Sequence, residues 1–165
     1  MIVAIDPGIS GAAAALSKGG FVDVIDLPTL GCGKKRMLDT VKLHGWISGV
    51  RPDRLVLEGV HSMPKQGVVS VFRFGMAVGI IRAVCEMWLD KGDIEWVEPA
   101  VWKGYFQLPG KDKEAARQMA IRLFSTHVDG TQNSRGVLTR KKDHQRAEAM
   151  LIAWWAARPP VGRNW

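Results

Sequence analysis

Cysteines and long apolar runs are scarce in this chain of 165 residues. Cys32 and Cys85 show no paired metal-site spacing and are too few for a disulfide framework, so we expect reduced thiols. No apolar run reaches the roughly 20 residues that span a bilayer, which argues against a membrane protein. The N-terminus lacks the charged head and cleavage site of a signal peptide, and we expect a mature intracellular chain.

Repeats, low-complexity tracts and linkers are also missing. The composition, 47% hydrophobic and 24% charged, is typical of a globular protein with a core rather than of a disordered chain. We therefore predict one domain that covers residues 1–165.

Positive charge is in excess. The net charge is +7 and the isoelectric point is about 9.7, which favours a polyanionic partner, although a basic surface can also serve solubility alone. Two clusters, Lys34-Lys35-Arg36 and Arg140-Lys141-Lys142, lie in segments expected to be loops. Loops of this kind can contact phosphates, which would make binding depend on salt.

The opening stretch combines an apolar strand with a carboxylate. Residues 2–6 form an apolar run that ends in Asp6, and the turn formers Pro7 and Gly8 follow at once. A second apolar run comes next and predicts an antiparallel strand. A carboxylate at the end of a buried strand is unfavourable unless it is paired, hydrogen-bonded or bound to a metal, so Asp6 is the first candidate functional residue.

The same arrangement occurs again at residues 54–58, a short apolar strand that ends in Glu58 before a glycine. The other segments, in which strands come first and then alternate with helices, predict a mixed α/β sheet. Expected strands are 12–17, 20–26 and 94–97; expected helices are 38–50, 68–88, 112–124 and 143–155; expected irregular segments are 28–36, 61–67, 99–110 and 126–139.

The long helix predicted at 68–88 carries Gly75, Gly79 and Ala83 at steps of four. Small residues on one stripe of a helix let another backbone come close. The stripe predicts a contact with a helix of this chain or of a second copy, and the sequence leaves both alternatives open.

The last helix opens with a third acidic group. His144 and Glu148 are four positions apart on one face, and Asp143 stands at the first turn. Acids from several elements suit phosphodiester hydrolysis with two divalent ions. Each acid also has an ordinary explanation, because Asp6 can form a turn, Asp143 can cap the helix and Glu58 can pair with a lysine.

Four ordered motifs, which span nearly the whole chain, resemble those of RuvC-type Holliday junction resolvases and are most similar to the compact phage and organellar branch. They are Ile5-Asp6-Pro7-Gly8-Ile9-Ser10-Gly11-Ala12, Leu57-Glu58, Gly67-Val68-Val69-Ser70-Val71-Phe72-Arg73-Phe74-Gly75 and Asp143-His144-Gln145-Arg146-Ala147-Glu148-Ala149-Met150-Leu151-Ile152-Ala153.

The resemblance implies an RNase H-like mixed five-stranded sheet flanked by helices, and a cytoplasmic homodimer of a bacterium or a phage-infected cell that nicks four-way DNA junctions symmetrically. It implies two Mg²⁺ or Mn²⁺ ions per active site, held by Asp6, Glu58 and Glu148. The fourth position departs from the family, whose acid or histidine three residues before the last acid is Gln145 here. We expect Asp143 as fourth ligand and His144 as a neighbouring or proton-transfer group.

The resemblance and the basic clusters also imply DNA contacts. One phenylalanine at the start of the long helix is expected to stack on a base at the crossover. The expected DNA-binding residues are Lys34, Lys35, Arg36, Lys65, Phe72, Arg73, Phe74, Arg140, Lys141 and Lys142.

Three other functions compete with junction resolution. A different RNase H-like nuclease, acting on branched DNA or on RNA–DNA hybrids, would use the same acids. An actin-like ATPase also opens on a strand that ends in aspartate, but it needs two related domains. A non-catalytic junction-binding module would leave Asp6, Glu58 and Glu148 without a purpose.

Overall fold

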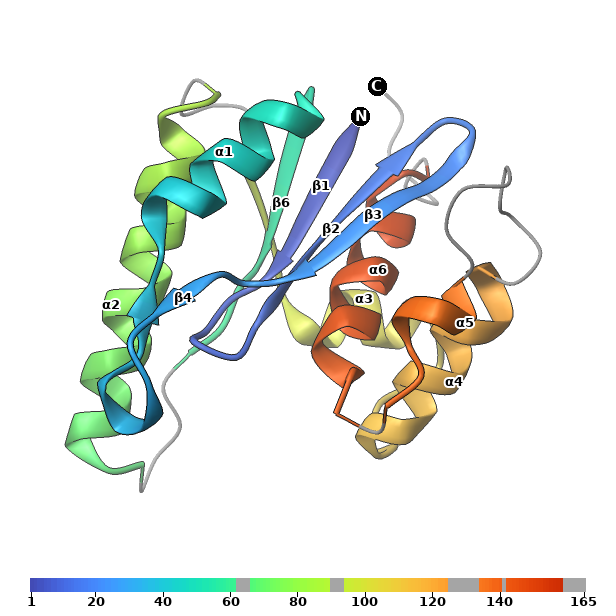
Figure 1. The fold of residues 1–165 in the computed structure, drawn as a ribbon. Coiled ribbons are helices and arrows are strands. Elements are labelled where there is room, and N and C mark those ends of the chain that lie inside the picture. The colour runs from blue at the N-terminus through green and yellow to red at the C-terminus, as the bar shows by residue number, and fades with distance from the viewer. Residues whose placement is uncertain (62–65, 90–93, 125–133, 141, 159–165) are drawn as a thin grey trace.

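A mixed five-stranded sheet forms the centre of the computed structural model, which describes residues 1–61, 66–89, 94–124, 134–140 and 142–158 (Figure 1). The strand order is β3-β2-β1-β6-β7, with β1 antiparallel to β2 and parallel to β6. This confirms the predicted sheet. Its strands are β1 (Ile2–Asp6), β2 (Ala12–Ser17), β3 (Gly20–Asp26), β6 (Arg54–Glu58) and β7 (Ile94–Val97).

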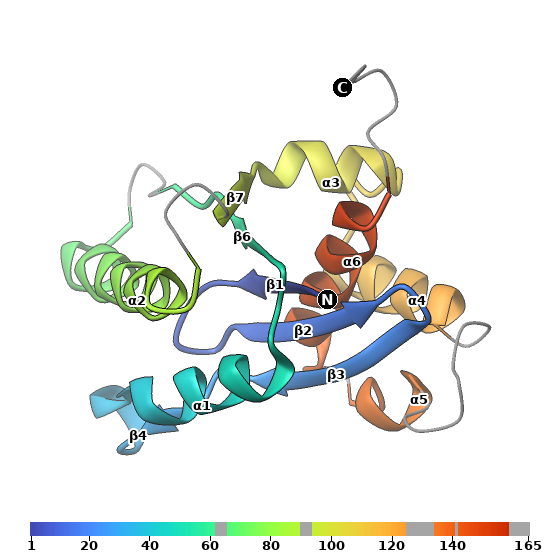
Figure 2. The same cartoon turned by 90° about the horizontal axis from the view of Figure 1, so that it is seen from above.

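Helices cover both faces of the sheet. Figure 2 shows α1 and α2 on one face and α3, α4 and α6 on the other. Each face has its own hydrophobic core, because successive side chains of β1 point to opposite sides: Val3 and Ile5 toward α1 and α2, Ala4 toward α6. The helices are α1 (Thr40–Val50), α2 (Val68–Glu86), α3 (Pro99–Tyr105), α4 (Lys113–Phe124), α5 (Ser134–Val137) and α6 (His144–Ala156).

Alanines bring α6 close to the centre of the sheet. Four consecutive alanines, residues 12–15, form most of β2, and α6 packs across β1 and β2 with Ala147 and Ala149 completely buried. Small side chains on both surfaces shorten the distance between helix and sheet. The result is that a helix distant in sequence lies against the strand that carries Asp6.

Several segments expected to be irregular are ordered. The segment 28–38 contains β4 (Thr29–Leu30), a single 3₁₀ turn (Gly33–Lys35) and β5 (Met37–Leu38), and β4 pairs with β5. Residues 134–137 are helical, whereas 125–133 lie outside the described residues. The α1 helix starts at Thr40 rather than 38, because the Asp39 side chain accepts a hydrogen bond from the Lys42 backbone.

The prediction that residues 99–110 are irregular was wrong for Pro99–Tyr105, which form α3, and right for residues 106–110. Proline is well accommodated in the first turn of a helix, where its missing N–H is not needed. Trp102 and Phe106, one turn apart, are both buried against the α6 face of the sheet. Burial of this pair explains why a short helix that contains Pro99 and Gly104 is stable here.

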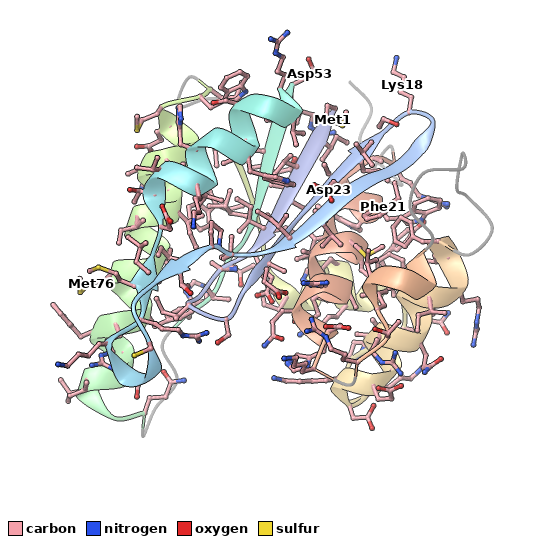
Figure 3. All side chains as sticks on the ribbon, viewed as in Figure 1. Met1, Lys18, Phe21, Asp23, Asp53 and Met76 are labelled. Atoms are coloured by element: carbon pink, nitrogen blue, oxygen red, sulfur yellow. The ribbon has the colours of Figure 1, made fainter. Side chains whose placement is uncertain are left out.

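The helix α2 leaves much of its apolar surface uncovered. Gly75, Gly79 and Ala83 are exposed, and Met76 points away from the body of the molecule (Figure 3). By length and composition alone, α2 is the one helix among the described residues that could cross a membrane. Its buried side, which includes Ala77 and Ile81, packs on the sheet. Apart from Arg73 and Arg82, the exposed side is mainly apolar, and its stripe of Gly75, Gly79 and Ala83 meets no other element in the described part of this chain.

The turn after Asp6 depends on Gly11. Its N–H donates to the Gly8 carbonyl over 3.1 Å, and its carbonyl accepts from the Leu27 N–H over 2.9 Å. A Cβ atom at Gly11 would lie 2.0 Å from the Asp6 carbonyl oxygen, which no side chain can tolerate without a backbone shift. The closeness of β1 and β2 at this end therefore requires glycine.

We expect Gly11→Ala to destabilise the protein by about 2 kcal/mol or more, because the backbone that carries Asp6 must move. Gly49→Ala in α1 is the matched control, since a Cβ there meets no atom within 4 Å and alanine raises helix stability by roughly 0.5–1 kcal/mol. Urea unfolding of both variants measures the difference. Equal stability of the two variants would contradict the tight turn.

Candidate metal centre

Three carboxylates meet at one edge of the sheet. Asp6 ends β1, Glu58 ends β6 and Glu148 lies on the second turn of α6. One ligand oxygen from each lies within 4.8 Å of those of the other two. Because β1 and β6 are parallel neighbours, with Ile5 opposite Leu57, their carboxyl ends reach the same edge.

The three acids lie in a largely buried environment. Asp6 is 7% exposed and Glu58 is 4% exposed. Burial raises the pKa of the Asp6 carboxyl well above its usual range, and the charges of Glu58 and Glu148 raise it further. Burial also raises the pKa of the Glu58 carboxyl. Concentrated negative charge of this kind is unfavourable until a cation neutralises it.

One lysine offsets part of this charge. The Lys103 ammonium lies 3.7 Å from Glu148 Oε1, and its positive charge opposes the rise in the pKa of Asp6 and of Glu58. A single ammonium cannot neutralise three carboxylates. Oxygen donors from separate elements are the ligand set preferred by Mg²⁺ and Mn²⁺, so the residues fit hard divalent cations.

The structure places Asp143 outside this group of three acids. Its carboxylate accepts hydrogen bonds from the Arg140 guanidinium, at 2.6 and 2.9 Å, and from the Arg140 backbone N–H at 2.8 Å. These contacts lower the pKa of Asp143 despite its burial. Asp143 thus holds the segment before α6, and its expected role as fourth ligand stays a prediction. His144 is half-buried, with Nε2 3.4 Å from Lys113 Nζ.

The expected DNA-binding residues are spread over two sides of the acids. Arg36 donates to Ser10 Oγ, beside the turn that follows Asp6. Phe72 is 68% exposed, whereas Phe74 is half-buried next to Gly8. Arg140 is engaged by Asp143. Lys35, Arg73 and Lys142 are exposed; Lys65, Lys141 and the side chain of Lys34 lie outside the described residues.

Sequence reasoning missed two residues that touch the acids. Trp102 Nε1 donates a hydrogen bond to Glu58 Oε1 over 2.9 Å, and Lys103 contacts Glu148. Both lie on α3, in the segment expected to be irregular. The spacing of Trp102 and Phe106 was the available sign of a buried helix.

Comparison with solved structures supports the fold. The structure of Thermus thermophilus RuvC is similar to this chain over 94% of its residues and 92% of the other chain, with a TM-score of 0.52 and 16% identity. T. thermophilus RuvC in complex with a Holliday junction substrate gives the same coverage, a TM-score of 0.56 and 15% identity. No family model and no curated protein matches the sequence. The chain has a RuvC-type, RNase H-like fold.

We expect Asp6→Asn to stabilise the metal-free protein at neutral pH, because it removes a buried charge that the folded state disfavours. The gain should vanish below the ordinary aspartate pKa, where the carboxyl is protonated in both the folded and the unfolded state.

Chemical unfolding in EDTA and then in Mn²⁺ measures this effect. Mn²⁺ should stabilise the unsubstituted protein more than the variant, which lacks one ligand charge. Asp53→Asn is the control, since Asp53 is exposed and pairs with the N-terminal ammonium rather than with the acids. Lower stability of Asp6→Asn in EDTA would show that the charge is already satisfied without a cation.

Proposed function

We propose that the protein is a metal-dependent endonuclease that resolves four-way DNA junctions by paired, symmetric nicks. The observation that carries the proposal is the group Asp6, Glu58 and Glu148, brought together from β1, β6 and α6 within a RuvC-type fold. The net charge of +7 suits a DNA substrate. In this proposal residues 1–165 form one nuclease domain. The protein would act in the cytoplasm, where the DNA of a bacterium or a phage-infected cell lies.

The three acids would hold two Mg²⁺ or Mn²⁺ ions. When bound, such ions activate water for in-line attack on the phosphodiester and stabilise the leaving oxygen. Asp6 and Glu58 are fixed by the sheet, and Glu148 is presented by α6. Asp143 can join this ligand set only if its ion pair with Arg140 opens. His144, the first residue of α6, would assist in proton transfer in this proposal.

A groove suited to unpaired bases includes Ile9, which lies in the turn that follows the strand of Asp6. Phe72, Met76 and Met37 line an apolar groove of about 430 Å³ between α2 and β5. Lys35, Arg36 and Arg73 border the same groove and supply positive charge. Aromatic stacking combined with cationic side chains is the usual way to hold single-stranded segments, so Phe72 is the better candidate for base stacking than half-buried Phe74.

We assign the uncovered face of α2 to a second copy of this chain. Its exposed Met87 continues the small-residue stripe of Gly75, Gly79 and Ala83 at a step of four, and none of these residues lines the groove. A Cβ at Gly75 or Gly79 meets no atom within 4 Å, so the described residues make no close packing there. A two-fold dimer would present two metal centres to a two-fold junction.

Cleavage of a mobile four-way junction tests the catalytic proposal. With Mg²⁺ or Mn²⁺ we expect symmetric paired nicks, and in EDTA none. Asp6→Asn should bind the junction normally but cleave it at least about 10³-fold more slowly, because the ion loses a ligand charge.

Asp53→Asn should retain both binding and cleavage. Preferred cleavage of RNA–DNA hybrids or of other branches would favour a different RNase H-like nuclease with the same acids. Binding without any cleavage under all metal conditions would favour a non-catalytic junction-binding module.

The second copy is tested with Gly79→Arg. The monomer has room for this side chain, but an α2–α2 contact does not, so the variant should sediment as a monomer and nick only one strand per binding event. Gly45→Arg is the matched control, an exposed helical glycine on α1 with equally open space. It should sediment like the unsubstituted chain. A dimeric Gly79→Arg would place the interface elsewhere.

A further inference from the structure

Trp102 contacts one of the three acids directly. The side chain is completely buried, and its indole N–H donates to Glu58 Oε1 over 2.9 Å. Glu58 is itself buried, so this contact is shielded from water on both sides. A hydrogen bond from a buried donor to a carboxylate is stronger and more directional than one in solvent.

The three acids differ in how firmly the fold holds them. Asp6 has a short side chain on the central strand β1. Glu58 has one more rotatable bond, so the end of strand β6 alone does not determine where its carboxylate lies. Trp102 restrains the Glu58 carboxylate, because its N–H donates to one lone pair of Oε1. The remaining lone pairs of the carboxylate stay available for a cation.

The flat face of the same indole carries a second contact. Lys103 Nζ lies 5.0 Å from the centroid of the Trp102 ring, and it also lies 3.7 Å from Glu148 Oε1. Cations prefer the electron-rich face of an indole. Trp102 therefore touches Glu58 with its edge and the partner of Glu148 with its face, which connects two of the three acids through one rigid side chain.

Packing alone does not explain a tryptophan here. A buried indole N–H needs an acceptor, and a backbone carbonyl is sufficient, as Trp88 shows by donating to the carbonyl of Pro52. An indole N–H can donate but not accept. It therefore orients the carboxylate without offering a competing ligand atom to a cation.

We propose that Trp102 is a positioning residue that holds Glu58 in the orientation required for cation binding. The inference rests on the proposed function, because it takes Asp6, Glu58 and Glu148 as the ligands. Outer partners that orient metal ligands change metal affinity by roughly 10–100-fold when they are removed.

Calorimetric titration of the full chain with Mn²⁺, without DNA, tests the proposal. Trp102→Phe keeps an aromatic ring but removes the N–H, and we expect about 10-fold weaker Mn²⁺ binding. Trp46→Phe is the matched control, because Trp46 Nε1 donates over 2.8 Å to Asp23, a carboxylate outside the three-acid group. It should bind Mn²⁺ with unchanged affinity.

A second measurement does not depend on the variant being stable. In ¹⁵N-labelled unsubstituted protein, the Trp102 indole N–H resonance should shift as Mg²⁺ is added, whereas the Trp46 resonance should not. In Glu58→Gln the Mg²⁺-dependent shift should be lost, because the acceptor is no longer a charged ligand.

The outcomes separate the two proposals. Unchanged Mn²⁺ affinity in folded Trp102→Phe, or a Trp102 resonance that ignores Mg²⁺ while the unsubstituted protein binds it, overturns the role of Trp102 and leaves the metal centre standing. Equal weakening in Trp46→Phe also overturns it, since the effect would then be general. Absence of Mn²⁺ binding to the unsubstituted chain overturns the metal centre and the inference together.

Discussion

Mutual repulsion among three carboxylates is the constraint around which this protein is built. Asp6, Glu58 and Glu148 lie within reach of one cation in a place from which water is largely excluded. Isolated charges in such surroundings are strongly unfavourable, so the rest of the fold must hold them there. Two of the acids are fixed at the ends of strands and the third lies on α6. The Trp102 N–H and the Lys103 ammonium offset part of their charge.

Ion pairs hold α6 at the edge of the sheet that carries the acids. Arg146 donates to both carboxylate oxygens of Asp26 at 2.6 and 2.8 Å, and Arg140 forms an ion pair with Asp143 just before α6. Asp26 pairs in register with Ala12, and Ala12 with Asp6, so these contacts act at the end of the sheet where Asp6 lies. Glu148, two residues after Arg146, is thereby kept near the strand ends.

The two faces of the sheet differ in what covers them. The α6 face contains the acids, the indole that touches them and the most extensive core. The other face buries one side of α2 and leaves the opposite side apolar and exposed. An apolar helix face on an otherwise well-packed molecule is typical of a protein–protein contact. The candidate metal centre and the uncovered side of α2 thus lie on opposite faces of the sheet.

Local pattern in the sequence was sufficient for the sheet strands, for α2, α4 and α6 within a few residues, and for the choice of Asp6, Glu58 and Glu148 as candidates. Strand periodicity and strand-end carboxylates depend only on residues close together in the sequence, so they can be recognised without knowledge of the tertiary structure. The short helix α3 escaped prediction because tertiary burial of Trp102, not local propensity, stabilises it. Asp143 pairs with Arg140, three residues earlier, and this local contact holds its carboxylate apart from the other three acids.

The amino-acid sequence by itself therefore determined which carboxylates stand at the ends of which strands, because alternation and turn residues act over a few positions. Only the tertiary structure decided that Trp102 donates to Glu58 and that Lys103 contacts Glu148. These contacts join residues separated by more than forty positions, and they form because α3 and α6 pack together on the same face of the sheet.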